Sequence, residues 1–156
     1  MLIITRRPGE DGWHGRAHVD LFDAGLFVEG PAGRNATFAL GARRSYIDAV
    51  LQLVLSDEDK RIFRTAPRYH DYLATYDWRT GAHRARFNLF GSEDFMVLHL
   101  DKPLENDPAV RGDLRNLSRW VTGQLLWDHQ LGDRTHLAHG VSYLWGHFAV
   151  GLASTV

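Results

Sequence analysis

The chain of 156 residues contains no cysteine. This absence excludes disulfide frameworks, thiolate zinc sites and cysteine nucleophiles. Only Lys60 and Lys102 are lysine, so nearly all of the 18 basic residues are arginine, which suits bidentate pairing and stacking. The longest nearly apolar stretch, residues 141–152, is too short to span a bilayer as a helix. The formal net charge of -1 argues against a general binder of polyanions.

Composition and the first residues predict the broad class of protein. Hydrophobic residues make up 44% of the chain, enough for a single domain with a core. In Met1–Arg7 the apolar residues precede the basic ones, the reverse of a secretory signal. We therefore expect a soluble cytoplasmic protein with no membrane partner.

The strands are predicted from alternation and turn residues. Apolar and polar side chains alternate from Trp13 to Leu21, which is typical of a strand with one buried face. Glycine and proline turns bound further short runs. A turn at residues 79–82 would pair Tyr76 with Ala85, and a second tight turn at 91–92 would add a third strand. The expected strands lie at 2–6, 13–21, 26–29 and 35–40, and in a meander over 70–100.

The helices are predicted from capping residues and apolar spacing. Ser45 and Asp48 have the spacing of a capping box, and Pro108 follows two residues typical of an N-cap. Apolar residues three and four apart follow each start signal. The expected helices span 45–54, 56–66, 108–130, and a last one from 133 or 135 to 151.

These elements predict a single α+β domain of order ββββαα-βββαα, with helices packed on antiparallel strands. A ββββαα half over residues 1–66 and a βββαα half over 67–156 echo each other in topology. No repeat at the level of residues supports a duplication, which stays a hypothesis.

Residues 1–10, with the sequence MLIITRRPGE, resemble the opening strand of the carbon storage regulators. In that family the first strand helps to bind RNA, and the family is a short dimer with swapped strands. The resemblance ends at Glu10, and the RNA-binding role is not transferred to this chain.

The predicted last helix carries the main cluster of residues that could perform chemistry. At about 100° per residue, its histidines and a tyrosine share one face opposite an apolar face. Neutral imidazoles at such spacing can bind one metal ion. The alternative is a solvated or half-buried helix face. The candidate ligands for a small molecule or one divalent metal are His136, His139, Tyr143 and His147.

A second candidate surface lies in the predicted meander. If the chain turns at residues 91–92, arginines of one strand share a face with aromatic and β-branched residues of the next. Arginine and aromatic residues are enriched at binding hot spots, although the same face could instead lie under a helix. The residues expected to bind a partner are Arg84, Arg86, Phe95 and His99.

No catalytic motif is found: the chain lacks a phosphate-binding loop, a dinucleotide fingerprint and a nucleophile elbow. The leading hypothesis is therefore a non-enzymatic protein without a cofactor that docks onto another macromolecule, such as an immunity or anti-defence inhibitor or an adaptor. Another protein is the favoured partner. The alternatives are a metal-dependent or small-molecule enzyme that uses the histidine cluster, and a nucleic-acid-binding protein that uses Arg6, Arg7, Arg84 and Arg86.

Overall fold

The fold is a seven-stranded antiparallel sheet. The computed structural model describes residues 8–47, 50, 53, 65–100 and 112–153, of which Ile47, Val50 and Leu53 are helical. All seven elements whose bounds are described are strands. The strands are β1 (His14–Val19), β2 (Asp23–Pro31), β3 (Ala36–Ser45), β4 (Thr65–Thr80), β5 (His83–Leu100), β6 (Gly112–Gly132) and β7 (Thr135–Ala153).

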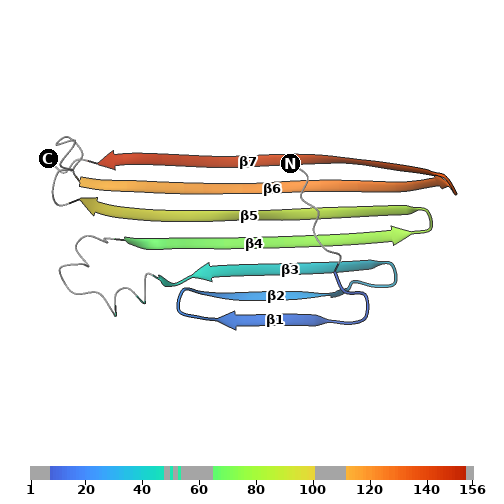
Figure 1. Cartoon of the computed structure of the whole chain (residues 1–156), viewed down its shortest axis with the longest axis horizontal. Helices are drawn as coiled ribbons and strands as arrows, with labels where there is room; N and C mark the ends of the chain where they lie inside the picture. The colour runs from blue at the N-terminus through green and yellow to red at the C-terminus, as the bar shows by residue number, and fades with distance from the viewer. Residues whose placement is uncertain (1–7, 48–49, 51–52, 54–64, 101–111, 154–156) are drawn as a thin grey trace.

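The strands follow one another in sequence order, so every neighbour in the sheet is also a neighbour in the chain (Figure 1). They lengthen from 6 residues in β1 to 21 in β6 and 19 in β7. Strand β3 pairs with β4, so the sheet is continuous across the boundary expected near residue 66. β1 and β7 form its two edges.

The predicted α+β fold is wrong, and the last two helices show why. Residues 112–132 and 135–153 form the long hairpin β6–β7. The helix at 108–130 was predicted from Leu114, Leu117, Val121 and Leu125. Leu114 lies on the opposite face of β6 from the other three, which are four residues apart. A spacing of four also keeps residues on one face of a strand, because four is a multiple of two. Three glycines in β7 disfavour a helix there.

The hairpin β4–β5 was predicted with the correct faces and the wrong register. Tyr76 pairs with Phe87 rather than with Ala85, and the turn residues are Gly81 and Ala82. The register differs by two residues, and a shift of two leaves every side chain on its expected face.

The predicted turn at residues 91–92 does not exist. β5 continues through Gly91 to Leu100. A Cβ atom at Gly91 would lie 2.5 Å from both the carbonyl oxygen of Trp120 and the hydroxyl of Tyr72. This glycine therefore allows a close approach of neighbouring groups within the sheet.

Several predicted elements lie outside the described residues. These are the strand at 2–6, most of the helix at 45–54, and nearly all of the helix at 56–66. Near the second of these, the backbone N–H of Val50 donates a hydrogen bond to the carbonyl of Tyr46 over 3.3 Å.

Alternation along the strands gives the sheet two chemically different faces. The face that carries Leu40, Tyr76, Phe87 and Leu125 is called the apolar face. The opposite one, which carries Asp77 and Arg86, is called the mixed face. Cross-strand pairs keep each set together from β1 to β7.

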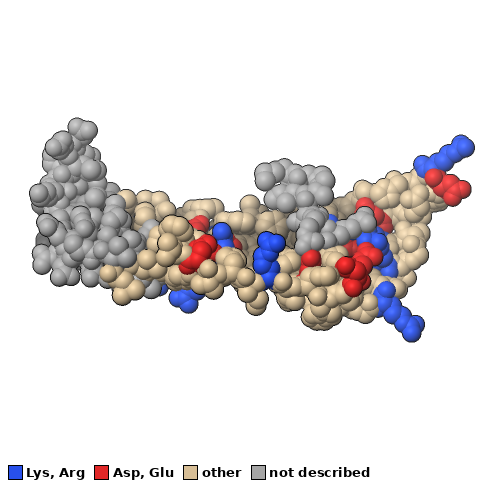
Figure 2. Space-filling model, turned by 60° about the horizontal axis from the view of Figure 1, so that its bottom comes forward, with Lys and Arg blue, Asp and Glu red and all other residues tan. Residues whose placement is uncertain are grey.

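Neither face is covered by a second layer of the described residues. Figure 2 shows a thin molecule whose surface is largely uncharged between clusters of charge. The buried apolar residues described are only Ala36, Ala39 and Val97, whereas Tyr143 is 71% exposed. A sheet normally buries an apolar face against another element, and none of the described residues provides that element here. Among the described residues, no helix has the length and apolar character needed to cross a membrane.

Candidate functional site

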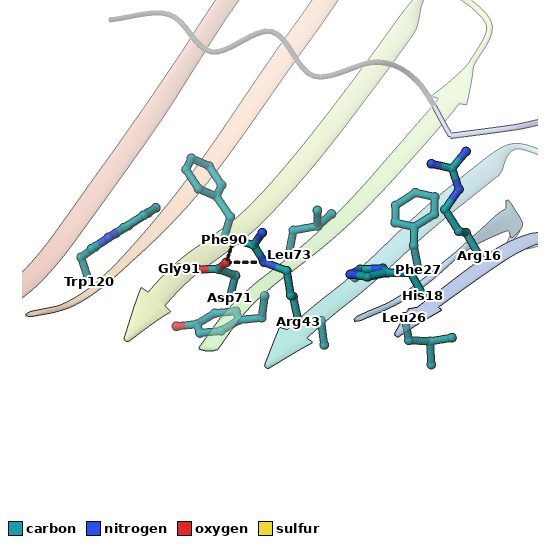
Figure 3. A pocket seen from close by; sticks show the side chains of 13 residues that line it. Arg16, His18, Leu26, Phe27, Arg43, Asp71, Leu73, Phe90, Gly91 and Trp120 are labelled. Atoms are coloured by element: carbon teal, nitrogen blue, oxygen red, sulfur yellow. Dashed lines mark hydrogen bonds and ion pairs between the residues drawn. The ribbon is translucent and has the colours of Figure 1, made fainter. Parts of the chain in front are cut away.

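An apolar trough crosses the mixed face. A cavity of about 400 Å³ lies over β1–β6 (Figure 3). The side chains of Phe27, Leu73, Phe90 and Trp120 rise from four different strands on the same side of the sheet, and Leu26 points to the other side. The rings of Phe90 and Trp120 meet edge to face, with centroids 5.9 Å apart.

Gly41 forms part of the floor of this trough. A Cβ atom at this position would lie 3.3 Å from the side chains of both Leu73 and Phe27. That distance is tighter than ordinary van der Waals contact, so any larger side chain would fill the hollow between them.

The trough continues toward β7. A second cavity of about 340 Å³ shares Phe90 and Trp120 with the first and extends to Leu144 and Phe148. The two cavities therefore form one apolar path across the sheet.

Charged groups line the trough from its β1 end to Asp71 on β4. Arg43 donates from Nε to Asp71 over 2.9 Å, a bond drawn in Figure 3, and its guanidinium lies 3.8 Å from Asp23. His18 and Arg16 line the β1 end. Among the described residues, Arg16 has no carboxylate partner.

A short hydrogen-bonded chain supports this end. His18 Nε2 lies 2.7 Å from Asp23 Oδ1, and the hydroxyl of Tyr69 donates to Asp23 Oδ2 over 2.5 Å. The hydrogen bonds from Tyr69 and then from His18 lower the pKa of the Asp23 carboxyl. The same bond raises the pKa of the Tyr69 phenol, since the anionic carboxylate favours its protonated form.

His18, Asp20 and Asp23 are also the described group whose ligand atoms approach one another within 4.8 Å. These atoms already form hydrogen bonds within the protein. Asp20 Oδ1 accepts the backbone N–H groups of Phe22 and Asp23 at 2.8 and 3.0 Å, and Asp23 holds His18 and Tyr69. A cation would have to displace these bonds beside Arg43, so the geometry is that of a hydrogen-bonded turn.

A buried ion cluster occupies the other end of the mixed face. Asp77 is 2% exposed and accepts hydrogen bonds from Nε of Arg84 at 3.2 Å and Nε of Arg86 at 2.8 Å. Beside it, Thr75 donates to Asn88, and Asn88 donates to Gln124, both over 3.0 Å. These polar groups satisfy one another across β4, β5 and β6.

The predicted partner surface is divided between the two faces. Arg84 and Arg86 belong to the ion cluster, and their side chains are only 17% and 9% exposed. Phe95 has the opposite parity on the continuous strand β5, which places it on the apolar face, and the side chain of His99 lies outside what the structure describes. Phe95 lies under the guanidinium of Arg68, 5.5 Å from its ring centroid.

The predicted histidine cluster is divided in the same way. His139, Tyr143 and His147 lie on the apolar face of β7, while His136 is on the mixed face, 3.7 Å from Asp128. Eight residues of strand separate His139 from His147, about 26 Å, so they cannot bind one ion. A closer pair, not predicted from the sequence, lies across β5 and β6, where Nδ1 of His83 and Nδ1 of His129 are 2.7 Å apart.

Comparison with protein-family models, with curated proteins and with solved structures finds no match to this chain.

Proposed function

We propose that this chain is a non-enzymatic docking protein whose apolar face lies against the acyl chains of a lipid layer. The observation that carries the proposal is a band of exposed apolar side chains on that face. A protein partner and a cytoplasmic location, both expected from the sequence, stay predictions that nothing in the fold tests.

The band consists of four rows of side chains that run across the strands. One row joins Phe38, Tyr76, Phe87, Leu125 and Val141 through consecutive strand pairs. Several members are large and open to solvent, with exposures of 44% for Phe87 and Leu125 and 65% for Val141. Four rows two residues apart extend over about 20 Å along the strands, a depth suited to acyl chains.

The outer rows of the band are rich in tryptophan and tyrosine. Trp78 and Trp127 lie in the outer row near the β4–β5 turn, and Tyr72 and Trp145 lie in the row at the opposite limit. These side chains have an apolar body and a polar tip, and they are favoured where hydrocarbon meets water.

A charged row borders the band beyond Tyr72 and Trp145. It runs across five strands, and Nε of Arg119 donates to Glu93 within it over 2.6 Å. The change from apolar to charged side chains along the strands follows the change in polarity from acyl chains to headgroups. The row consists of Arg44, His70, Glu93, Arg119 and His147.

The expectation of no membrane partner depended on the absence of a long apolar run. In a strand, however, apolar residues occur at every second position. A surface made from several strands can therefore be continuously apolar although no segment of the sequence is.

Two single-tryptophan variants provide a direct test. Trp145 on β7 is on the apolar face, and Trp120 on β6 is on the mixed face at nearly the same height, since Trp120 pairs with Gly146. Each variant keeps one of them and carries phenylalanine at the other four tryptophan positions. Both are combined with phosphatidylcholine vesicles whose acyl chains are brominated, and their fluorescence is compared with that in unbrominated vesicles.

We expect the bromine atoms to quench Trp145 several-fold more strongly than Trp120, because quenching needs near contact. Equal quenching of the two, or no quenching of Trp145, would contradict the proposal. A monodisperse dimer or a complex with another protein that forms without lipid and protects Trp145 from acrylamide would assign the apolar face to a protein partner instead.

A further inference from the structure

We infer that the trough on the mixed face binds a single-chain amphipathic carboxylate, with its apolar body in the trough and its carboxylate at Arg16. The inference does not depend on the lipid proposal, because the trough lies on the other side of the sheet.

The walls of the trough suit a narrow apolar body. Phe27, Leu73 and Phe90 lie in one row across the strands that is interrupted at Gly41, and Trp120 lies beside Phe90 (Figure 3). Small molecules bind most often in concave apolar sites of this size with a few polar groups at defined places. The glycine at position 41 keeps the floor open between Phe27 and Leu73.

The trough has a direction, because Arg16, which has no carboxylate partner among the described residues, lies at its β1 end, whereas the Arg43–Asp71 ion pair lies over β3 and β4. Arg16 is on the edge strand β1, whereas Phe90 is on β5, four strands away and about 19 Å across the sheet. An elongated molecule therefore fits with one polar end at β1 and an apolar remainder that extends toward β5 and the continuation at Leu144.

The charge at that end favours an anion. The guanidinium of Arg43 is already balanced by Asp71 and lies near Asp23, and His18 is hydrogen-bonded to Asp23. Arg16 lines the cavity beside them without a carboxylate partner among the described residues. A guanidinium can donate two parallel hydrogen bonds to a carboxylate, which makes a fatty-acid-like ligand the best chemical match.

The test uses the Trp120 single-tryptophan variant in a neutral alkyl-maltoside detergent, which covers the apolar face. Bromododecanoate is added as a quencher, and dodecanoate, dodecanol and dodecyltrimethylammonium are tested as competitors. We expect saturable quenching of Trp120 that dodecanoate reverses and the neutral and cationic compounds do not. The Trp145 variant serves as a control, since it reports only partition of the probe into the micelle.

Two substitutions in the Trp120 variant separate shape from charge. Gly41→Val fills the floor of the trough, and we expect it to abolish saturable quenching. Arg16→Gln removes the charge at an exposed position of β1 and is expected to weaken binding about tenfold or more, the usual worth of a hydrogen bond to a charged group. Gly123→Val is the matched control, because a Cβ atom at Gly123 would have no neighbour within 4 Å.

Quenching that does not saturate, or that is the same for Trp120 and Trp145, would overturn the inference. Saturable binding that Gly41→Val and Arg16→Gln leave unchanged would place the ligand elsewhere and would overturn it equally. Each variant is first compared with the parent by circular dichroism, and Arg16→Gln, at an exposed position, tests the site if Gly41→Val does not fold. Failure here leaves the bilayer experiment on Trp145 unaffected.

Discussion

Replacement of Asp77 by asparagine is expected to destabilise the sheet strongly. The side chain of Asp77 is almost completely buried and is the carboxylate that balances Arg84 and Arg86. Asparagine has nearly the same shape, so the substitution removes the charge without leaving a cavity. Its amide group also presents a donor where guanidinium donors already point.

The expected cost follows from the burial of the partners. Arg86 is only 8% exposed, so water cannot take the place of the lost charge. Removal of one partner from a buried ion pair typically costs about 3–5 kcal/mol. Asp71→Asn is the matched control, because Asp71 also accepts hydrogen bonds from an arginine but its side chain is 34% exposed. Exposed pairs contribute about 0.2–1 kcal/mol.

The assay is denaturant-induced unfolding of the parent and both variants under identical conditions, followed by circular dichroism. The double variant Asp77→Asn with Arg86→Met is added, because removing both charges is expected to cost less than removing Asp77 alone. The reasoning fails if Asp77→Asn is no more destabilising than Asp71→Asn, or if the double variant shows no recovery.

Two further predictions concern glycine and pH. Gly91→Ala should destabilise the sheet, because the new Cβ atom would lie 2.5 Å from a backbone carbonyl oxygen of the neighbouring strand. Gly123→Ala should be near neutral, because its Cβ atom would have no neighbour within 4 Å. Equal midpoints of unfolding for the two variants would refute this difference. The pKa of the Asp23 carboxyl is lowered in the folded chain. The ionised carboxyl therefore stabilises the fold fully at pH values above its pKa in the unfolded chain, about 3.9. This stabilisation is lost as the pH falls through the pKa of Asp23 in the folded chain. Unfolding midpoints measured at pH 6 and at pH 3 should therefore differ less for Asp23→Asn than for the parent, and an unchanged difference would count against this assignment.

The hairpin β4–β5 shows how much of this fold can be predicted from the sequence. A glycine turn flanked by alternating residues identified both strands and both faces. The exact register could not be predicted, because a shift of two residues preserves every face. Both registers also pair an acid with a base, since Asp77 lies opposite Arg84 in the predicted register and opposite Arg86 in the observed one.

The strands β6 and β7 show where such prediction fails. The spacing of Leu117, Val121 and Leu125 satisfies a helix and a strand equally. The glycines of β7 at positions 140, 146 and 151 and its β-branched and aromatic residues were the available signals for a strand. Hydrogen-bonded pairing between the long strands, a non-local effect, overrides the local helical spacing.

The trough could not be predicted from the sequence at all. Phe27 and Trp120 are far apart in the chain, and they line the same face only because four strand pairings fix the register between β2 and β6. Motif searches look for residues at fixed separations, and no fixed separation describes this site. The predicted histidine cluster was wrong for a different reason. Its residues are regularly spaced, but the period of a helix placed His136 on the same face as His139, whereas in a strand the two lie on opposite faces.

The alternation of the two faces has a consequence for how this gene can change. Insertion or deletion of a single residue within β5 would exchange its faces, so that the arginines of the ion cluster would point toward the apolar side and Phe87 toward the buried carboxylate. Insertion or deletion of two residues would keep both faces and only slide the strand. We therefore expect natural variation inside the long strands to preserve parity, with changes of odd length confined to the turns.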